Sequence, residues 1–290
     1  CTRKRSAMKC DEQSIREHVS RENLRDTIRK ALARTGETVT GTADTEAFDE
    51  FHIRGREATR ALAALAGLAA GMRVLDLGCG IGGPARTLAA EYGCIVTGVD
   101  LVEEYVRAAE MLTAQVGLSD RVDFRHGDMA ALPFEPGSFD AVWTVHTTMN
   151  VENKPDLFAG MARVLKPDGL LVLYEVCAGS ASPPYYPVPW ASDDAINFLV
   201  SAEELKRLLG AAGYMEVAWQ DVSSLSLEWL KRTIAARKAA GKGGGPAKVG
   251  LGVVMGETAA QKSGNMVRNL EEDRIRLIQG VFRLRARSTP

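Results

Sequence analysis

Residues 74–83 read Val-Leu-Asp-Leu-Gly-Cys-Gly-Ile-Gly-Gly, an apolar strand that runs into a turn rich in glycine. Pro84 follows, and proline is well placed in the first turn of a helix. Glycines in such a turn let the backbone approach a ligand closely, and the helix start offers free N–H groups. Gly78, Gly80 and Gly83 also fit the dinucleotide pattern G-x-G-x-x-G, which by itself is a weak signal. The stretch predicts a ligand site at a strand–turn–helix junction and leaves the ligand open.

Short apolar runs alternate with helix-like segments on both sides of this turn. The runs are Arg73–Leu77, Ile95–Val99, Val122–His126, Ala141–Thr144, Leu170–Glu175, Glu216–Val222 and Ile275–Arg287. Helices are expected at Ala202–Ala212, Leu225–Ala240 and about Thr258–Glu272, and an Ala/Leu-rich one is expected to end near Gly71. Alternation of this kind is typical of βαβ units and a parallel sheet. Lys166-Pro167-Asp168-Gly169 is interpreted as a turn before the fifth strand.

The two remaining parts of the chain suggest additions to this sheet. The first 35 residues carry ten basic and five acidic side chains and show helical spacing from about Ser14 to Arg34. We therefore predict a helical N-terminal arm and linker over residues 1–45 and a single main domain over 46–290. About 50 residues, 223–272, separate the last two strands. Insertions of this size are often lids, and the glycine tract Gly241–Pro246 would supply flexibility.

Composition excludes several classes of protein. The chain has 290 residues, is 46% apolar, and balances 36 Lys and Arg against 37 Asp and Glu. A balanced charge argues against general nucleic-acid coating, and no apolar run reaches the roughly 18–20 residues of a bilayer span. The five cysteines are odd in number and not in metal-ligand pairs, so we expect no metal site and a reducing, cytoplasmic setting. The oligomeric state stays open.

Acidic residues end or follow three successive predicted strands. Asp76 precedes the glycines, where a carboxylate can accept hydrogen bonds from the turn or from an ammonium group. Asp100 ends the second strand and could accept both hydroxyls of a ribose, which would serve a nicotinamide dinucleotide equally well. Gly127-Asp128-Met129 follows the third strand and offers a carboxylate for an exocyclic amine and an apolar face for a purine. A dinucleotide site has less need of this third element.

These features resemble class I S-adenosylmethionine-dependent methyltransferases, over about Phe48 to Ala286. The resemblance is strongest at Val74–Ala89, Asp100, Gly127-Asp128, Phe139–Val142 and Val164–Gly169. Residues 78–86, Gly-Cys-Gly-Ile-Gly-Gly-Pro-Ala-Arg, look like the small-molecule branch with sarcosine/dimethylglycine, tocopherol and sterol methyltransferases. The resemblance implies a Rossmann-like α/β fold whose seven-stranded, mostly parallel sheet has an antiparallel last strand.

The resemblance also assigns cofactor-binding residues. Asp76, Gly78 and Gly80 would hold the methionine part of S-adenosylmethionine. Asp100 would hold the ribose, Leu101 would lie on the adenine, and Asp128 with Met129 would contact the adenine edge and face. Thr144, at the end of the fourth strand, is placed with this set. Gly82 and Gly83 serve helix–strand packing or the ligand, and Asp140 is expected to anchor backbone.

The acceptor must lie beyond the carboxyl ends of the strands, because ligands of open α/β sheets bind there. His146 follows the fourth strand and could act as a base, orient the acceptor or simply hydrogen-bond within its loop. Tyr186 and Trp190 follow the fifth strand and could wall a pocket or form a packed aromatic loop. His52 is expected to flank a helix rather than contact a ligand. Arg268 and Lys242 are expected on the surface.

We therefore expect methyl transfer from S-adenosylmethionine to a small-molecule acceptor, with an amine nitrogen of the sarcosine or dimethylglycine type as the first choice. The alternative is O- or C-methylation of a phenolic or isoprenoid acceptor. An S-adenosylmethionine-binding module without turnover and an NAD oxidoreductase are the competing classes. Neither a nucleic acid nor a membrane is expected as a partner, and no Asn/Asp-Pro-Pro-aromatic motif follows the fourth strand.

Overall fold

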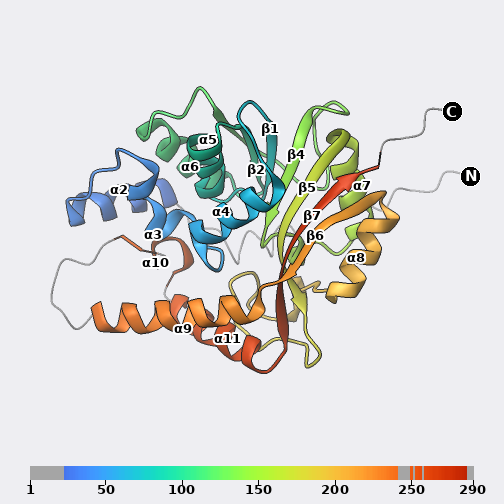
Figure 1. The fold of residues 1–290 in the computed structure, drawn as a ribbon. Helices are drawn as coiled ribbons and strands as arrows, with labels where there is room; N and C mark the ends of the chain where they lie inside the picture. Colours follow the sequence, from blue (N-terminus) through green and yellow to red (C-terminus); the bar gives the residue numbers. More distant parts are fainter. Residues whose placement is uncertain (1–22, 241–248, 251, 257, 286–290) are drawn as a thin grey trace, which may run out of the picture.

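A single seven-stranded sheet forms the centre of the molecule (Figure 1). The computed structural model describes residues 23–240, 249–250, 252–256 and 258–285. The strands are β1 Arg73–Leu77, β2 Ile95–Asp100, β3 Val122–His126, β4 Phe139–Val145, β5 Leu165–Ala178, β6 Tyr214–Asp221 and β7 Ile275–Leu284. Their order is β3-β2-β1-β4-β5-β7-β6. Neighbours among β1 to β5 pair in parallel, and β7 is antiparallel to both β5 and β6, which confirms the predicted fold class.

Helices cover both faces of the sheet. They are α2 Leu24–Thr35, α3 Glu46–Asp49, α4 Gly55–Ala66, α5 Gly83–Tyr92, α6 Glu103–Gln115, α7 Lys154–Val164, α8 Ala202–Ala211, α9 Ser223–Ala240, α10 Gly252–Met255 and α11 Ala259–Glu271. Because strand side chains alternate between faces, Val74 packs with α4 and α5 while Leu75 packs with α7 and α8. The described helices include none long and apolar enough to cross a membrane.

The described part of the predicted N-terminal arm is helical, as the spacing predicts. Helix α2 packs its buried Leu24 and Ile28 against α6, whereas residues 1–22 of the predicted arm lie outside the described residues. The predicted linker contains a short 3-10 helix at Thr42–Asp44. Helix α4 ends at Ala66 rather than near Gly71, because Gly67 already adopts the left-handed conformation that closes a helix. The division into parts at residue 45 stays a prediction.

The predicted turn before the fifth strand is an irregularity inside β5. Leu165 pairs with Phe139 and Leu170 with Ala141, so the intervening residues of β5 outnumber those of β4. Asp168 takes up the excess with a φ of 61°. The turn chemistry of Lys166–Gly169 was therefore correctly identified, but the strand begins before it rather than after it. Asp140 accepts a hydrogen bond from the backbone N–H of Arg73 at 2.8 Å and so anchors backbone as expected.

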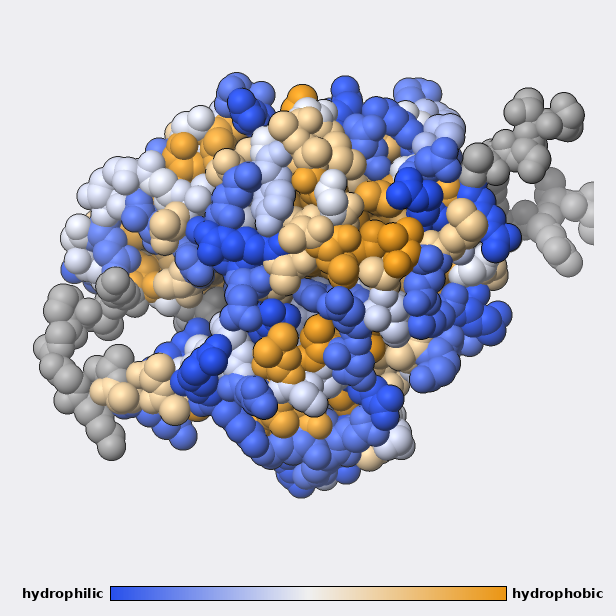
Figure 2. Space-filling model, in the orientation of Figure 1, coloured by the Kyte–Doolittle hydropathy of each residue, from blue (hydrophilic) through white to orange (hydrophobic). Residues whose placement is uncertain are grey.

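The insertion between β6 and β7 is helical. Helices α9 and α11 lie side by side along one end of the molecule (Figure 1). Their inward side chains Leu230, Met266 and Leu270 are buried in the same core as α4 and α5. Mainly hydrophilic side chains surround the lower rim of the visible face, where these helices lie (Figure 2). Helix α11 is therefore amphipathic, and the insertion packs against β7, while the glycine tract Gly241–Pro246 lies outside the described residues.

We predict that Gly83→Ala destabilises the fold whereas Gly160→Ala does not. An added Cβ at Gly83 would lie 2.3 Å from the backbone oxygen of Asp49, so backbone must shift. Overpacking of this kind costs about 1–3 kcal/mol. Gly160, inside α7, has nothing within 4 Å of an added Cβ, and alanine there should stabilise the helix by up to about 1 kcal/mol. Urea unfolding of both variants measures the difference, and equal stabilities would contradict the close approach.

Candidate active site

A cavity of about 460 Å³ lies at the carboxyl ends of the parallel strands. The strand order places the ends of β3, β2 and β1 along one side of it and the segment after β4 beside them. We call the first side, with Asp76, Asp100 and Asp128, the carboxylate half. The other side, the imidazole half, carries Phe51, His52, Ile53, Val145, His146, Met149, Trp190, Val254, Thr258, Lys262 and Met266. The two halves line one partly open cavity.

Asp76 is the least compensated charge of the carboxylate half. It is 2% exposed, and its Oδ2 atom has no hydrogen-bond partner. Burial raises the pKa of Asp76 to about 8, and the nearby carboxylates of Asp100 and Glu50 add to the shift. A buried carboxyl group without a partner is costly unless a ligand supplies a donor or a positive charge. The residue therefore fits a cationic ligand group.

Asp100 has the opposite arrangement, because backbone donors satisfy it. Its Oδ2 accepts a hydrogen bond from Gly80 N at 2.8 Å and its Oδ1 accepts one from Val102 N at 2.9 Å. Burial raises the pKa of Asp100, and the two backbone hydrogen bonds act against that shift. Each oxygen keeps a second lone pair for a ligand hydroxyl. Leu101, Asp128 and Met129 also line the cavity.

The glycines of the turn divide into two pairs. Gly78 and Gly80 line the cavity, and an added Cβ would lie 2.2 Å from Thr147 Cγ2 and 2.7 Å from Phe51 Cζ, respectively. Gly82 and Gly83 do not line it, and their missing side chains make room for Phe124 and for the backbone of Asp49. The second pair serves packing, one of the two roles considered for it, and the first pair lines the cavity, where its ligand role stays a prediction.

His146 is the central side chain of the imidazole half. The residue is half-buried, its Nε2 atom is buried without a hydrogen-bond partner, and its backbone has a φ of 50°. Burial lowers the pKa of His146 well below the usual range, and the nearby His52 lowers it further. The imidazole is therefore neutral at pH 7 and can accept a proton. Its ring centroid lies 4.5 Å from that of Tyr174 and 6.1 Å from that of His52.

His52 lines the cavity, in addition to flanking a helix as expected. Its Nε2 lies 2.9 Å from the backbone oxygen of Gly55 at the start of α4 and 3.3 Å from Thr59 Oγ1. Burial lowers the pKa of His52, while the carboxylate of Glu50 raises it. The sequence prediction identified the helix contact but missed the position of the ring on the cavity wall.

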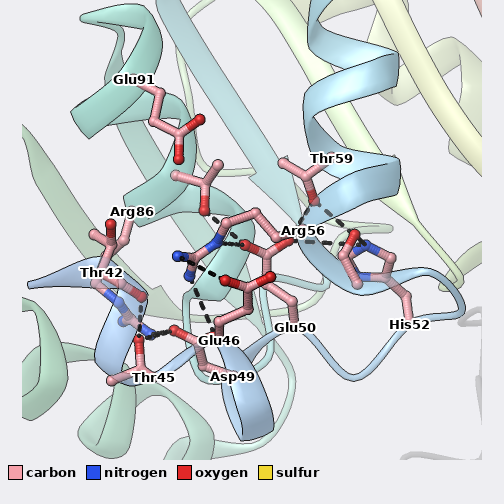
Figure 3. A network of polar contacts seen from close by, with 12 residues as sticks. Thr42, Thr45, Glu46, Asp49, Glu50, His52, Arg56, Thr59, Arg86 and Glu91 are labelled. Atoms are coloured by element: carbon pink, nitrogen blue, oxygen red, sulfur yellow. Dashed lines mark hydrogen bonds and ion pairs between the residues drawn. The ribbon is translucent and has the colours of Figure 1, made fainter. Parts of the chain in front are cut away.

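A buried network of charges holds His52 and its segment in place (Figure 3). Glu50 accepts hydrogen bonds from Arg56 Nε at 2.9 Å and from Thr87 Oγ1 at 2.6 Å, and also from Thr59. Asp49 pairs with Arg86 Nη2 at 2.9 Å, and both side chains are fully buried. The network joins the segment before α4 to α5, the helix that follows the glycine turn. It therefore fixes one wall of the cavity against the other.

The structure brings Trp190 to the cavity, but neither Tyr186, which was predicted for the acceptor side, nor Thr144, which was predicted for the cofactor side, lines it. Trp190 is 6% exposed, and its indole N–H donates to Asn197 Oδ1 at 2.8 Å. The hydroxyl of Tyr186 instead donates to Asp194 Oδ1 at 2.8 Å, and the residue is not on the cavity wall. Thr144 is fully buried and donates to Glu175 at 3.4 Å. Its side chain lies on the face of β4 that packs with Leu77 and Leu173 rather than toward the ligand space.

The insertion contributes wall residues that the sequence reasoning missed. Lys262 and Met266 lie one turn apart on α11 and line the cavity together with Thr258, which precedes that helix, and Val254 of α10. Their spacing was visible in the sequence, but nothing there showed which face would dock. Arg268 lies on the surface as expected, with its guanidinium 3.5 Å from the Tyr185 ring centroid and an ion pair to Glu272. Lys242 lies outside the described residues.

Comparison with known proteins agrees with this geometry. Residues 75–173 match the family described as "Methyltransferase domain". The matched range runs from β1 into β5, and the sheet order and the glycine turn agree with the fold that the sequence predicts for class I methyltransferases.

The curated relatives match this chain over only part of their own length. Sterol 24-C-methyltransferase ERG6B of Gibberella zeae is 40% identical over 109 residues, which are 38% of this chain and 29% of that protein. Methyltransferase GfsG of Streptomyces halstedii is 32% identical over 133 residues, which are 46% of this chain and 48% of that protein. The chain thus spans less than half of the length of these curated relatives.

Solved structures share the fold over most of the chain. Geranyl diphosphate C-methyltransferase from Streptomyces coelicolor superposes with a TM-score of 0.68 at 17% identity, covering 96% of this chain and 98% of that one. A putative sarcosine dimethylglycine methyltransferase from Galdieria sulphuraria gives a TM-score of 0.64 at 18% identity, covering 90% and 98%. At these identities the likeness concerns the fold.

We predict that Asp76→Asn stabilises the ligand-free protein but weakens donor binding at least tenfold. The folded pKa of about 8 exceeds the unfolded value of about 3.9, so the free energy of unfolding falls as pH rises between them. Asparagine does not ionise and escapes this loss. The melting temperature of the variant should therefore exceed that of the wild type more at pH 8 than at pH 6.

Thermal unfolding at both pH values and calorimetric titration with S-adenosylmethionine measure the two effects. Asp120→Asn, which changes an exposed carboxylate, is the control and should alter neither. A variant that binds the donor as tightly as the wild type would show that Asp76 does not hold its ammonium group.

Proposed function

We propose that this protein transfers a methyl group from S-adenosylmethionine to a small, mainly apolar acceptor. One observation carries the proposal: Asp76, a buried carboxyl group whose Oδ2 has no partner, and His146, a neutral imidazole whose Nε2 has no partner, line the same cavity. The first suits a cationic donor, and the second suits an acceptor that must lose a proton. The family match and the named relatives support the same conclusion.

The residues present fit the donor. Asp76 would hold the donor's ammonium group, and Gly78 and Gly80 would let backbone approach its methionine part. Asp100, which keeps lone pairs beyond its backbone hydrogen bonds, would accept the ribose hydroxyls. Leu101 and Met129 would contact the adenine faces and Asp128 its amino edge, as the resemblance implies. When bound, S-adenosylmethionine supplies an electrophilic methyl group, and no metal is needed for this displacement.

The acceptor half argues against a cationic amine. Among the described wall residues of the imidazole half there is no carboxylate, and the charged side chain there is the ammonium of Lys262. Asp49, a further carboxylate on the wall, is held by Arg86. An amine of the sarcosine type carries a positive charge near neutral pH and would find no counter-charge on this side. The amine acceptor, our first expectation, therefore has less support than its alternative.

An isoprenoid or sterol-like alkene, or a phenol, fits this half better. Phe51, Ile53, Met149, Trp190 and Met266 supply an apolar and partly aromatic wall. Aromatic faces stabilise positive charge that develops on a carbon acceptor. The relatives named as sterol 24-C-methyltransferases point in the same direction.

The proposed chemistry assigns one task to His146. When an alkene carbon gains the methyl group, the acceptor becomes a cation and must lose a neighbouring proton. When a phenol is methylated, its hydroxyl proton must leave. In both cases the neutral imidazole accepts that proton, while the surrounding wall aligns the acceptor and excludes water. His52 orients the neighbouring wall through its contacts with α4.

A panel of acceptors tests the proposal. The enzyme is incubated with S-adenosylmethionine labelled in its methyl group and, separately, with a sterol alkene, a linear isoprenoid, a phenol, sarcosine and dimethylglycine. We expect label in the isoprenoid, sterol or phenol product. Transfer to sarcosine or dimethylglycine alone would restore the amine hypothesis, and donor binding without any transfer would favour a binding module.

Substitutions at the two halves should separate donor binding from turnover. Asp100→Ala should weaken donor binding more than His146→Ala, because Asp100 belongs to the carboxylate half, which would bind the donor. His146→Ala should lower kcat by about 10²–10⁴-fold, the usual contribution of a general base. Calorimetry and single-turnover rates measure the two quantities. An equal loss of donor affinity in both variants would remove the acceptor-side role of His146.

A further inference from the structure

The segment after β4, residues 146–151, carries His146 and is held by two buried charged residues that do not line the cavity. We call this segment the β4 loop. The first residue is Lys154, at the start of α7, which is 3% exposed. Its Nζ donates hydrogen bonds to the backbone oxygens of Thr148 at 3.1 Å, Val151 at 2.8 Å and Phe198 at 2.7 Å. A single ammonium group thus fixes two carbonyls of the loop.

The second residue is Glu175, near the end of β5, which is 1% exposed. Its Oε1 accepts hydrogen bonds from the backbone N–H of Thr148 and from Thr144 Oγ1, both at 3.4 Å. Its Oε2 is buried without a partner. Glu175 and Lys154 therefore hold the N–H and the C=O of the same residue, Thr148, from opposite sides.

The β4 loop is connected to two parts of the acceptor side, the His146 ring and the segment that carries Trp190. Its first N–H, that of His146, donates to Tyr174 O at 2.7 Å, one residue before Glu175 on β5. Its Asn150 side chain donates to the backbone oxygens of Trp190 at 2.9 Å and Ile196 at 2.8 Å. A shift of the loop would therefore move the His146 ring and the Trp190 segment together.

The loop needs such support because His146 has a φ of 50°, in a region that costs a non-glycine residue about 1 kcal/mol or more. Hydrogen bonds to charged groups are stronger than neutral ones. Burying the two charges is costly, however, and well-packed apolar residues often stabilise a fold as much or more. Stability alone therefore gives no reason for both charges to act on the backbone of one short loop.

We propose that Glu175 and Lys154 are positioning residues that fix the β4 loop, so that the His146 imidazole and the Trp190 wall meet the acceptor in one geometry. The proposal rests on the proposed function for its consequence in catalysis. It concerns two residues that contact neither donor nor acceptor, and it predicts that their loss reduces turnover without reducing donor affinity.

Steady-state kinetics and donor binding test the proposal on three variants. Glu175→Leu removes the acceptor of both hydrogen bonds and should lower kcat by about 10- to 100-fold, as misplacement of a reacting group does. Glu175→Gln keeps the shape and one acceptor oxygen, so it should recover part of that loss. Lys154→Met should resemble Glu175→Leu. The dissociation constant of S-adenosylhomocysteine should stay within twofold of the wild type in all three.

Asp140→Asn is the matched control, because it neutralises a carboxylate at the other end of β4, away from the loop. Asp140→Asn should change neither kcat nor the dissociation constant of S-adenosylhomocysteine. Combining Glu175→Leu with Lys154→Met should lower kcat little further than either alone, since both act on one loop. A folded Glu175→Leu or Lys154→Met variant with the kcat of the wild type would overturn the proposal, as would a parallel loss of donor affinity.

Histidine NMR separates this proposal from the proposed function. The chain has four histidines, so the His146 ring signal can be assigned by its loss in His146→Asn. Glu175→Gln should shift or broaden that signal and leave the His126 signal unchanged. If the wild type methylates no acceptor, the proposed function fails, but a shifted His146 signal still supports the positioning role. An unchanged His146 signal in Glu175→Gln contradicts the positioning role, whatever the activity. The same measurement tests that role if Glu175→Leu and Lys154→Met fail to fold.

Discussion

The fully buried ion pair between Asp49 and Arg86 joins the segment before α4 to the helix that follows the glycine turn. Because Gly83 has no side chain, the backbone of Asp49 can approach that helix closely enough for the pair to form. Removing one partner of such a pair costs about 3–5 kcal/mol, since the other charge stays buried. The pair thus helps to place Phe51 and His52, which follow Glu50 in the same segment, on the cavity wall.

The cavity formed in this way is electrostatically uneven. Asp76, Asp100 and Asp128 lie at the ends of the strands on one side, while the imidazoles of the other side are kept neutral by burial. A donor with a positive sulfur and an ammonium group is attracted to the first side, and it loses the charge on sulfur when its methyl group leaves. The second side offers a proton acceptor in apolar surroundings. This division assigns different tasks to the two halves without any residue serving both.

The fold and the donor side could be predicted because their signals are local. Strand β1 and its glycine turn, and the carboxylates that end or follow β1, β2 and β3, lie within a few residues of one another or of a recognisable strand end. Thr144 was placed on the wrong face of β4, because side chains alternate along a strand and the sequence did not show which face points to the cavity. Tyr186 and Lys262 depend on how an irregular segment and an inserted helix dock. That docking is decided by tertiary packing, which leaves no local pattern in the sequence.

The family match covers some of the cavity residues and leaves out others. Residues 75–173, which match the methyltransferase family, contain every residue of the carboxylate half and His146. His52, Trp190 and Lys262 come from segments on either side of that range. The matched range therefore contains the carboxylate half and His146, whereas part of the remaining cavity wall comes from residues on either side of that range. Because the buried pair Glu175 and Lys154 holds the boundary between the two, the position of His146 relative to that wall depends on contacts outside the cavity itself.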